Sequence, residues 1–121
     1  MLKYKKTTEA IIGSAFEVYN ILGHGFLEKV YQRALQVELL NRGYSAELEK
    51  AIKVKFKGII VGDYAADLLV DNKVIVELKV AKKYNTNDEP QLLNELKATE
   101  KKVGLLINFG KQKLEFKRFI Y

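Results

Sequence analysis

The sequence predicts a single α/β domain in which helices flank a mixed β-sheet, with the element order α-α-β-β-β-α-β-β. Apolar residues first recur with a helical period, and after residue 50 the period changes to two. A further helical segment separates the third strand from the fourth, so these two strands are expected to run parallel. The 121 residues are enough for one hydrophobic core, and residues 1–121 are expected to form one domain.

Two helices are expected before the strands begin. Residues 7–23 carry apolar side chains at helical spacing, and Thr7 or Thr8 can cap the start of this helix. Residues 26–43 show the same spacing. Both segments end in glycine, which readily adopts the left-handed conformation that ends a helix. A Gly-His-Gly turn connects them.

A third helix is expected within residues 85–101. Asn87 or Asp88 can cap it, and Pro90 lies in its first turn, where the missing N–H does no harm. The residues expected to face inward are Leu92, Leu93 and Leu96.

Five segments predict strands. In the first, Lys53, Lys55 and Lys57 alternate with apolar residues, which is typical of a strand with one buried and one solvated face. The second and third strands are joined by the turn-forming sequence Asp-Asn-Lys. The fourth is continuously apolar, as in a strand buried on both faces. The expected strands are residues 51–58, 59–70, 73–80, 103–110 and 113–121.

The composition limits the classes of function. The net charge of +6 favours a polyanionic partner, nucleic acid first, although lysine is also a common solubilising residue. The absence of cysteine excludes a disulfide framework and a thiolate metal site. No apolar run is long enough to span a bilayer, and the first residues do not resemble a signal peptide. We therefore expect a cytoplasmic protein that does not contact a membrane.

Acidic residues interrupt the two most apolar strands. A three-residue loop at 71–73 would place Asp67 opposite Glu77 on one face of the sheet, whereas a two-residue loop would send Asp67 to the other face. Because facing carboxylates repel, one is expected to be protonated or a cation to lie between them. Oxygen ligands without His or Cys suit Mg²⁺ or Mn²⁺, and Lys79 is placed to orient a water or a phosphate. The alternative is a Glu77–Lys79 ion pair, with Asp67 marking a strand end.

The two strands that read AADLLVDNKVIVELK are similar to the D…ExK core of the PD-(D/E)XK nuclease superfamily. The wider pattern resembles the small GxxExxY proteins of that superfamily, and their naming motif is intact at residues 25–31, GFLEKVY. Three further blocks resemble that family: IIGSAFEVYNILGHGFLEKVYQRAL, QLLNELK and VGLLINFG. The resemblance covers about residues 9–120 and implies a single-domain, restriction-endonuclease-like core.

The resemblance implies roles for five residues. Asp67 and Glu77 would be metal ligands, and Lys79 would be the catalytic lysine. Glu28 would be an additional acid at the metal, directly or through a water. Gln91 would match the glutamine that related nucleases place at the site.

Some residues of these motifs also have structural interpretations. Glu28 could be a solvated helix residue, and Gln91 a capping-box partner of Asp88. Gly25 is expected to serve the backbone at the start of the second helix. Tyr31 is expected to lie in the core with its hydroxyl group bonded.

Three positions depart from the family pattern. His24 stands where the family usually has proline, Glu95 where tyrosine commonly follows QLLN, and Asp88 where histidine is frequent. The metal-binding acids are untouched by these changes. They weaken the expectation that the third helix positions a substrate.

The sequence thus leads to two expectations of function. The first is a Mg²⁺-dependent nuclease acting on nucleic acid, DNA rather than RNA, with a homodimer or protein partner supplying specificity. The second is a catalytically silent module with the nuclease fold that binds nucleic acid or a protein partner. The basic surface and the changed third helix favour the second, whereas acids that would face a polyanion count against it.

Overall fold

The structure, a computed structural model, describes residues 3–121 and has the predicted element order. Within these residues the helices are α1 (Lys5–Leu22), α2 (Glu28–Asn41) and α3 (Glu89–Thr99), and a short 3-10 turn, η1 (Thr86–Asp88), precedes α3. The strands are β1 (Ala46–Phe56), β2 (Ile59–Val70), β3 (Val74–Lys79), β4 (Val103–Phe109) and β5 (Leu114–Ile120).

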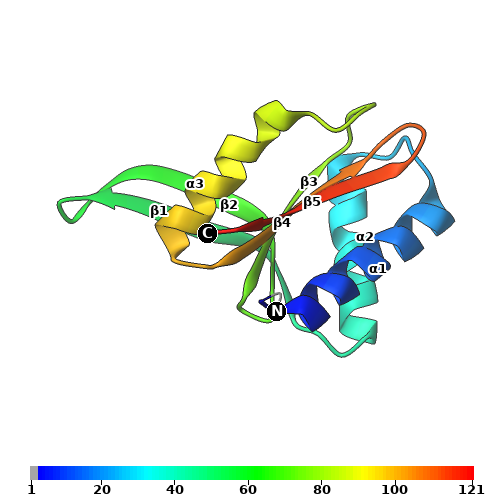
Figure 1. Cartoon of the computed structure of the whole chain (residues 1–121), viewed down its shortest axis with the longest axis horizontal. Helices are drawn as coiled ribbons and strands as arrows, with labels where there is room; N and C mark the ends of the chain where they lie inside the picture. The colour runs from blue at the N-terminus through cyan, green and yellow to red at the C-terminus, as the bar shows by residue number, and fades with distance from the viewer. Residues whose placement is uncertain (1–2) are drawn as a thin grey trace.

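In the described chain, the strands form one mixed sheet in the spatial order β1-β2-β3-β4-β5. β3 and β4 run parallel, and every other neighbouring pair is antiparallel. α3 makes the crossover between the two parallel strands, as predicted. α1 and α2 cover one face of the sheet, and α3 covers the other (Figure 1). No helix within residues 3–121 has the length and apolar character needed to cross a bilayer.

β3 divides its side chains between two hydrophobic cores. Val76 and Leu78 lie in the core against α1 and α2, and Ile75 lies in the core against α3. Because side chains alternate along a strand, Glu77 and Lys79 are on the α3 face of the sheet. The acid and the lysine therefore belong to the side that one helix, rather than two, covers.

α3 packs closely against the sheet at Gly104 of β4. A Cβ atom at this position would lie 2.9 Å from a methyl carbon of Leu92. The close approach brings the first turns of α3 next to β3, which is where the site lies.

The turn between β2 and β3 has the predicted length of three residues. Val70 pairs with Val74, so residues 71–73 form the loop. Asp71 and Asn72 both have positive φ, a conformation that these two residue types tolerate better than most.

The start of α1 differs from the prediction. The helix begins at Lys5, so Thr7 and Thr8 lie inside it and are buried rather than capping it. The Thr8 hydroxyl donates a hydrogen bond to the Lys5 carbonyl, which satisfies the hydroxyl within the first turn.

The start of α3 also differs from the prediction. Asp88 makes no side-chain cap, and the Asn85 side chain instead accepts a hydrogen bond from the Asn87 N–H, which closes η1. Leu92 is buried as predicted, but Leu93 is 37% exposed. Consecutive helix residues point in directions about 100° apart, and the buried face of α3 is formed by Leu92, Glu95 and Leu96, so Leu93 lies beside it.

β1 begins at Ala46 rather than at residue 51. Its pairing with β2 extends from Ala46–Val70 to Phe56–Ile59, and it passes through a residue with positive φ, Glu49. Residues 46–50 belong to this strand because their backbone pairs with β2. Backbone pairing of this kind leaves no pattern in the sequence. For this reason the prediction began only where lysine and apolar residues alternate.

The outer part of the β1–β2 hairpin projects beyond the rest of the molecule (Figure 1). β2 pairs with β3 only over Leu68–Val70, so further along β2 has β1 as its partner on one side only. Ile59 is 68% exposed and Ile60 53% exposed in this projecting part. The separation of β2 from β3 creates a fork in the sheet, and this fork holds the acidic residues.

Candidate active site

The candidate site forms where β2 and β3 separate. Their last pair is Leu68–Val76, and the next backbone N–H of β3 that could bond, that of Leu78, donates to Asp67 Oδ2 at 2.7 Å. Continuing the same register places Asp67 opposite Glu77, the arrangement that a three-residue loop predicts. The Asp67 carboxylate thus takes the place of a strand carbonyl in the fork.

Glu77 is a buried acid that lies among other acids. Its residue is 4% exposed, and burial, a hydrogen bond to Glu95 and the charge of Asp67 together raise the pKa of the Glu77 carboxyl to about 11. Glu77 Oε2 and Glu95 Oε1 have no hydrogen-bond partner if both groups are ionised. A proton on Glu77 supplies the missing donor, so the metal-free chain carries a neutral Glu77 at pH 7.

The ionisation of Asp67 is subject to opposing influences. Burial raises the pKa of its carboxyl, while the hydrogen bonds from the Leu78 N–H and from Glu77 oppose that shift. The charge of Glu49 raises the same pKa further, and that of Lys79 lowers it. One proton shared across the fork relieves the repulsion that two facing carboxylates would otherwise create.

Glu28 faces the same fork from α2. Burial raises the pKa of its carboxyl, and the charge of Asp67 adds to the shift, whereas the charge of Lys79 opposes it. Glu28 is the first residue of α2, where a negative charge interacts favourably with the helix dipole. Its half-buried position agrees with a residue at a site rather than with a fully solvated helix residue.

Gln32 anchors α2 to the fork. Its Nε2 donates to the Asp67 backbone carbonyl at 2.8 Å and to a Glu49 carboxylate oxygen at 3.2 Å. Gln32 lies one helical turn after Glu28, so both point from the same face of α2. The sequence interpretation missed Gln32 and Glu49, and the spacing of four residues from Glu28 is the signal that could have indicated Gln32.

Lys79 lies beside the acids without forming an ion pair. The ion pairs found among residues 3–121 do not include Lys79, and Glu77 is buried rather than paired at an edge. Its positive charge acts on the pKa of both Asp67 and Glu28. The Glu77–Lys79 ion pair, which was the alternative interpretation of the sequence, is therefore absent from the described part of the chain.

Gln91 is linked to the fork through another residue. It is exposed in the first turn of α3, and its Nε2 donates to Glu95 Oε2 at 3.2 Å. Glu95 in turn contacts Glu77. Asp88 makes no side-chain cap, so Gln91 has no capping-box partner there.

The turn before α2 is held by Tyr31, which is fully buried, as predicted. The Tyr31 hydroxyl donates to the Gly23 carbonyl and accepts from the Phe26 N–H. Gly25 has a φ of 121°, a conformation that residues with a Cβ rarely adopt, which confirms its backbone role. His24 lies against the Phe109 carbonyl with Nδ1 at 2.9 Å, and since a carbonyl only accepts, Nδ1 carries the proton.

The donor set in the fork is suited to a hard divalent cation. Within residues 3–121, no three His, Cys, Asp or Glu side chains are grouped so that they could hold one ion together. Mg²⁺ does not need such a group, because it usually keeps several waters and binds one or two carboxylates. Glu77 has a buried oxygen without a hydrogen-bond partner, and its carboxyl group neighbours that of Asp67, which fits this chemistry. Glu28 lies close enough to Asp67 and Lys79 for their charges to act on its carboxyl group.

Comparisons with known proteins identify the family and the fold. The family model for the PD-(D/E)XK nuclease superfamily matches residues 5–119. The solved structure of SSO0001 is similar, with a TM-score of 0.55 and 17% identity over 95% of this chain and 57% of that chain. An alkaline exonuclease (LHK-Exo) from Laribacter hongkongensis has a TM-score of 0.43 and 11% identity, over 94% of this chain and 82% of that chain. No curated protein matches the sequence.

The likeness to SSO0001 concerns the fold alone. This chain spans little more than half the length of that protein.

Proposed function

The chain belongs to the PD-(D/E)XK nuclease superfamily, and on that premise we propose that it is a Mg²⁺-dependent nuclease that hydrolyses phosphodiester bonds of DNA. The observation that carries the proposal is the fork between β2 and β3. There Asp67 and Glu77 face each other, with Lys79 beside them and free of any ion pair within residues 3–121.

The proposed roles follow from these positions. Asp67 and Glu77 hold the metal, and Glu28 reaches it through water. A bound Mg²⁺ supplies activation of a water molecule and charge stabilisation at the phosphate. Lys79 orients the attacking water or the scissile phosphate. Gln91 acts on the fork through Glu95, by holding the Glu95 carboxylate in place.

The Leu78 N–H keeps Asp67 directed into the fork. This contact fixes one metal ligand before any substrate binds, which reduces the reorganisation needed for catalysis. It also defines the best variant for a test, because an asparagine can accept the same hydrogen bond without carrying a charge.

The finer parts of the proposal rest on composition and motif. The net charge of +6 supports a nucleic-acid substrate, and the intact motif at residues 25–31 supports placement among the GxxExxY proteins. We expect phosphate contacts rather than base recognition, since no base-reading motif was found in the sequence. The proposal also includes a single domain over residues 1–121 and a cytoplasmic location. A homodimer or a protein partner would supply specificity.

The test compares Asp67→Asn with Asp63→Asn. Asp63 is an exposed acid on the same strand whose only described ion pair is with Lys53. Asp67→Asn is expected to lose Mg²⁺ binding, followed by calorimetry, and cleavage of single-stranded and duplex DNA together. Asp63→Asn is expected to keep both. If Asp67→Asn cleaves at the wild-type rate, the assignment of the fork as the active site is wrong.

A second function is supported by the contact between Glu77 and Glu95. The Glu95 carboxyl group lies next to a neutral Glu77. A catalytically silent module could retain this arrangement, because it does not need ionised carboxylates to bind a metal. This module would bind nucleic acid or a protein partner without cleaving. Absence of Mg²⁺ and Mn²⁺ binding to the wild type, together with retained nucleic-acid binding, would favour it over the nuclease.

A further inference from the structure

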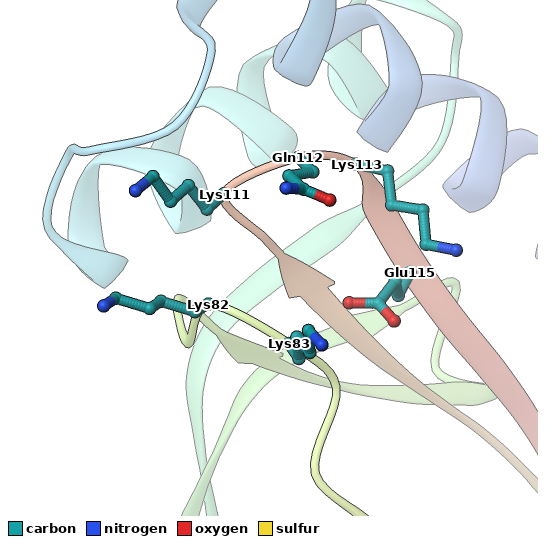
Figure 2. A pocket seen from close by; sticks show the side chains of 6 residues that line it. All are labelled: Lys82, Lys83, Lys111, Gln112, Lys113 and Glu115. Carbon is teal, nitrogen blue, oxygen red and sulfur yellow. The ribbon is translucent and has the colours of Figure 1, made fainter.

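A basic pocket lies beyond the end of β3, outside the acidic fork. Its volume is about 420 Å³, and Figure 2 shows its lining side chains, which come from two loops and from the start of β5. One loop follows β3 and the other is the turn between β4 and β5. The lining residues are Lys82, Lys83, Lys111, Gln112, Lys113 and Glu115.

The two loops of the pocket are joined by a backbone hydrogen bond and by one buried side chain. The Lys111 N–H donates to the Lys82 carbonyl at 3.2 Å. Asn108 is 1% exposed, and its amide bonds both backbone groups of Ala81, accepting from the N–H at 2.9 Å and donating to the carbonyl at 3.0 Å. The lysines are therefore presented by backbone that is held in place.

Gly110 allows the loops to come this close. A Cβ atom there would lie 2.6 Å from the Lys113 carbonyl oxygen and 3.2 Å from that of Lys82. The Gly110 carbonyl accepts a hydrogen bond from the Tyr19 hydroxyl at 2.7 Å, which ties the turn to α1. Several contacts thus stabilise a turn that gathers like charges.

The positive charge of the pocket is largely uncompensated. None of its lysines takes part in an ion pair found among residues 3–121. Glu115 is the acid of the pocket, and its Oε1 already accepts from the Tyr84 N–H at 2.9 Å and from the Asn108 side chain. In Figure 2 the side chains of Lys82 and Lys111 extend in the same direction. Lys82 and Lys111 thus bring two ammonium groups to the same side of the hollow, and a bound anion would reduce the repulsion between them.

The pocket is close to the acidic fork along the chain. Lys82 follows Lys79 by three residues, so their Cα atoms are at most about 11 Å apart. The turn that contains His24 bonds to the Phe109 carbonyl at the edge of the pocket and leads directly into α2, which begins with Glu28. A nucleic-acid strand lying in the fork would therefore pass the lysines within a few nucleotides.

We propose that this four-lysine pocket binds a phosphate group of the nucleic acid other than the one that is cleaved. The substrate class rests on the proposed function, whereas the pocket itself rests on its own lysines and loops. The phosphate comes either from within the strand or from its end. A planar base edge is a poor match for the site, because ammonium groups recognise phosphate as point charges.

The test measures DNA binding by fluorescence anisotropy in EDTA, over a series of salt concentrations. The variant Lys82→Ala/Lys111→Ala removes two charges from the pocket and keeps the backbone hydrogen bond between these residues. The matched control, Lys6→Ala/Lys73→Ala, removes two charges from a hollow at the opposite end of β3. The variant Lys82→Arg/Lys111→Arg keeps the charge.

The pocket variant is expected to bind about 10-fold more weakly and to have a salt slope smaller by about one, as loss of one phosphate contact requires. The control is expected to change affinity less than about 3-fold, and the arginine variant is expected to restore binding. Equal affinities and salt slopes for the pocket variant and the control would overturn the proposal.

Oligonucleotides with and without a terminal phosphate show which phosphate of the strand the pocket binds. A preference for the terminal phosphate that disappears in Lys82→Ala/Lys111→Ala assigns the pocket to a strand end, and equal binding of both oligonucleotides assigns it to an internal phosphate.

Asp67→Asn separates this proposal from the proposed function. Lost cleavage with retained pocket-dependent binding supports both, and a wild type that binds through the pocket but never cleaves supports the pocket alone.

Discussion

At the scale of single residues, the chemistry of this protein depends on which acid in the fork carries a proton. Glu77 is buried beside Asp67 and Glu95, and its pKa is raised to about 11. Asp67 accepts a hydrogen bond from the Leu78 N–H, which favours the ionised form of its carboxyl group. A divalent cation would displace the proton on Glu77, so proton release is expected to accompany metal binding.

Glu77→Gln is expected to stabilise the metal-free protein. The folded pKa lies above the unfolded value of 4.5, so the folded chain holds a proton that the unfolded chain releases, and stability falls as pH rises from about 4.5 towards 11. Glutamine removes this loss while keeping the shape of the side chain. We expect the variant to be more stable at pH 8 by about 1–3 kcal/mol in EDTA, measured by urea unfolding.

The pH series provides the control for this prediction. The difference between Glu77→Gln and wild type should grow between pH 5 and pH 9 and vanish near pH 4. Added Mg²⁺ should stabilise the wild type and leave Glu77→Gln unchanged. A difference independent of pH would mean that Glu77 is ionised in the folded protein.

Lys79→Ala separates metal binding from catalysis. Removing a cation beside two acids makes the fork more negative, so Mg²⁺ affinity is expected to stay equal or rise. Cleavage is expected to fall by about 10²-fold or more, because the phosphate loses a positive charge in its transition state. Unfolding free energy should change by less than about 1 kcal/mol, since Lys79 has no ion pair in the described chain.

Lys97→Ala is the matched control for this variant, because Lys97 is an exposed lysine on α3 outside the fork. It should leave cleavage and Mg²⁺ affinity at wild-type values. Cleavage by Lys79→Ala at the wild-type rate would remove the lysine from the mechanism.

At the scale of elements, β2 serves two purposes along its length. Over Leu68–Val70 it pairs with both β1 and β3 and belongs to the core of the sheet. From Asp67 towards Ile59 it pairs with β1 alone, and its exposed apolar residues project with the hairpin. The point where β2 changes from one role to the other is the fork, so the same departure from β3 creates both the projecting hairpin and the site.

The two parts of the sheet are expected to differ in stability. Ile75 is 2% exposed between β2 and β4, and Ile75→Ala should cost about 2–5 kcal/mol of unfolding free energy. Ile60→Ala, the same substitution in the projecting hairpin, should cost less than about 0.5 kcal/mol. Urea unfolding of the two variants checks this. Equal losses would show that the hairpin is buried in solution, and sedimentation would then reveal whether a second copy covers it.

At the scale of the whole molecule, the excess positive charge is not spread evenly. The acids of the fork lie within a chain of net charge +6, and several lysines collect in one pocket near the end of β3. Such a distribution attracts a polyanion to the molecule while leaving a local negative site for a cation. We therefore expect a bound cation to help a phosphate approach the acids.

Nucleic-acid binding by the whole protein is expected to weaken steeply with salt and to depend little on base sequence. The reason is that lysine contacts to phosphates release counterions and carry no sequence information. Anisotropy titrations with two oligonucleotides of unrelated sequence check both points. Binding that is insensitive to salt would favour the protein-interaction module over the nuclease.

The element order, the parallel pair of strands and the three-residue turn were predictable, because periodicity and turn residues are local. From that turn alone, Asp67 and Glu77 could be placed on one face of the sheet. Helix ends were less predictable. Several residues can cap a helix. α1 begins before the expected threonines, whereas α3 begins directly after Asp88, as predicted, but without a hydrogen bond from its side chain.

The sequence by itself determined the fold class, the basic character and the acidic pair with its lysine, since each lies within one segment or two adjacent strands. Only the tertiary structure brought Glu95 of α3 against Glu77, tied Gln32 of α2 to the Asp67 carbonyl, and joined Lys82 to Lys111. These contacts join residues far apart in the chain. They depend on how helices pack on the sheet and where strands separate, and neither leaves a periodic pattern in the sequence.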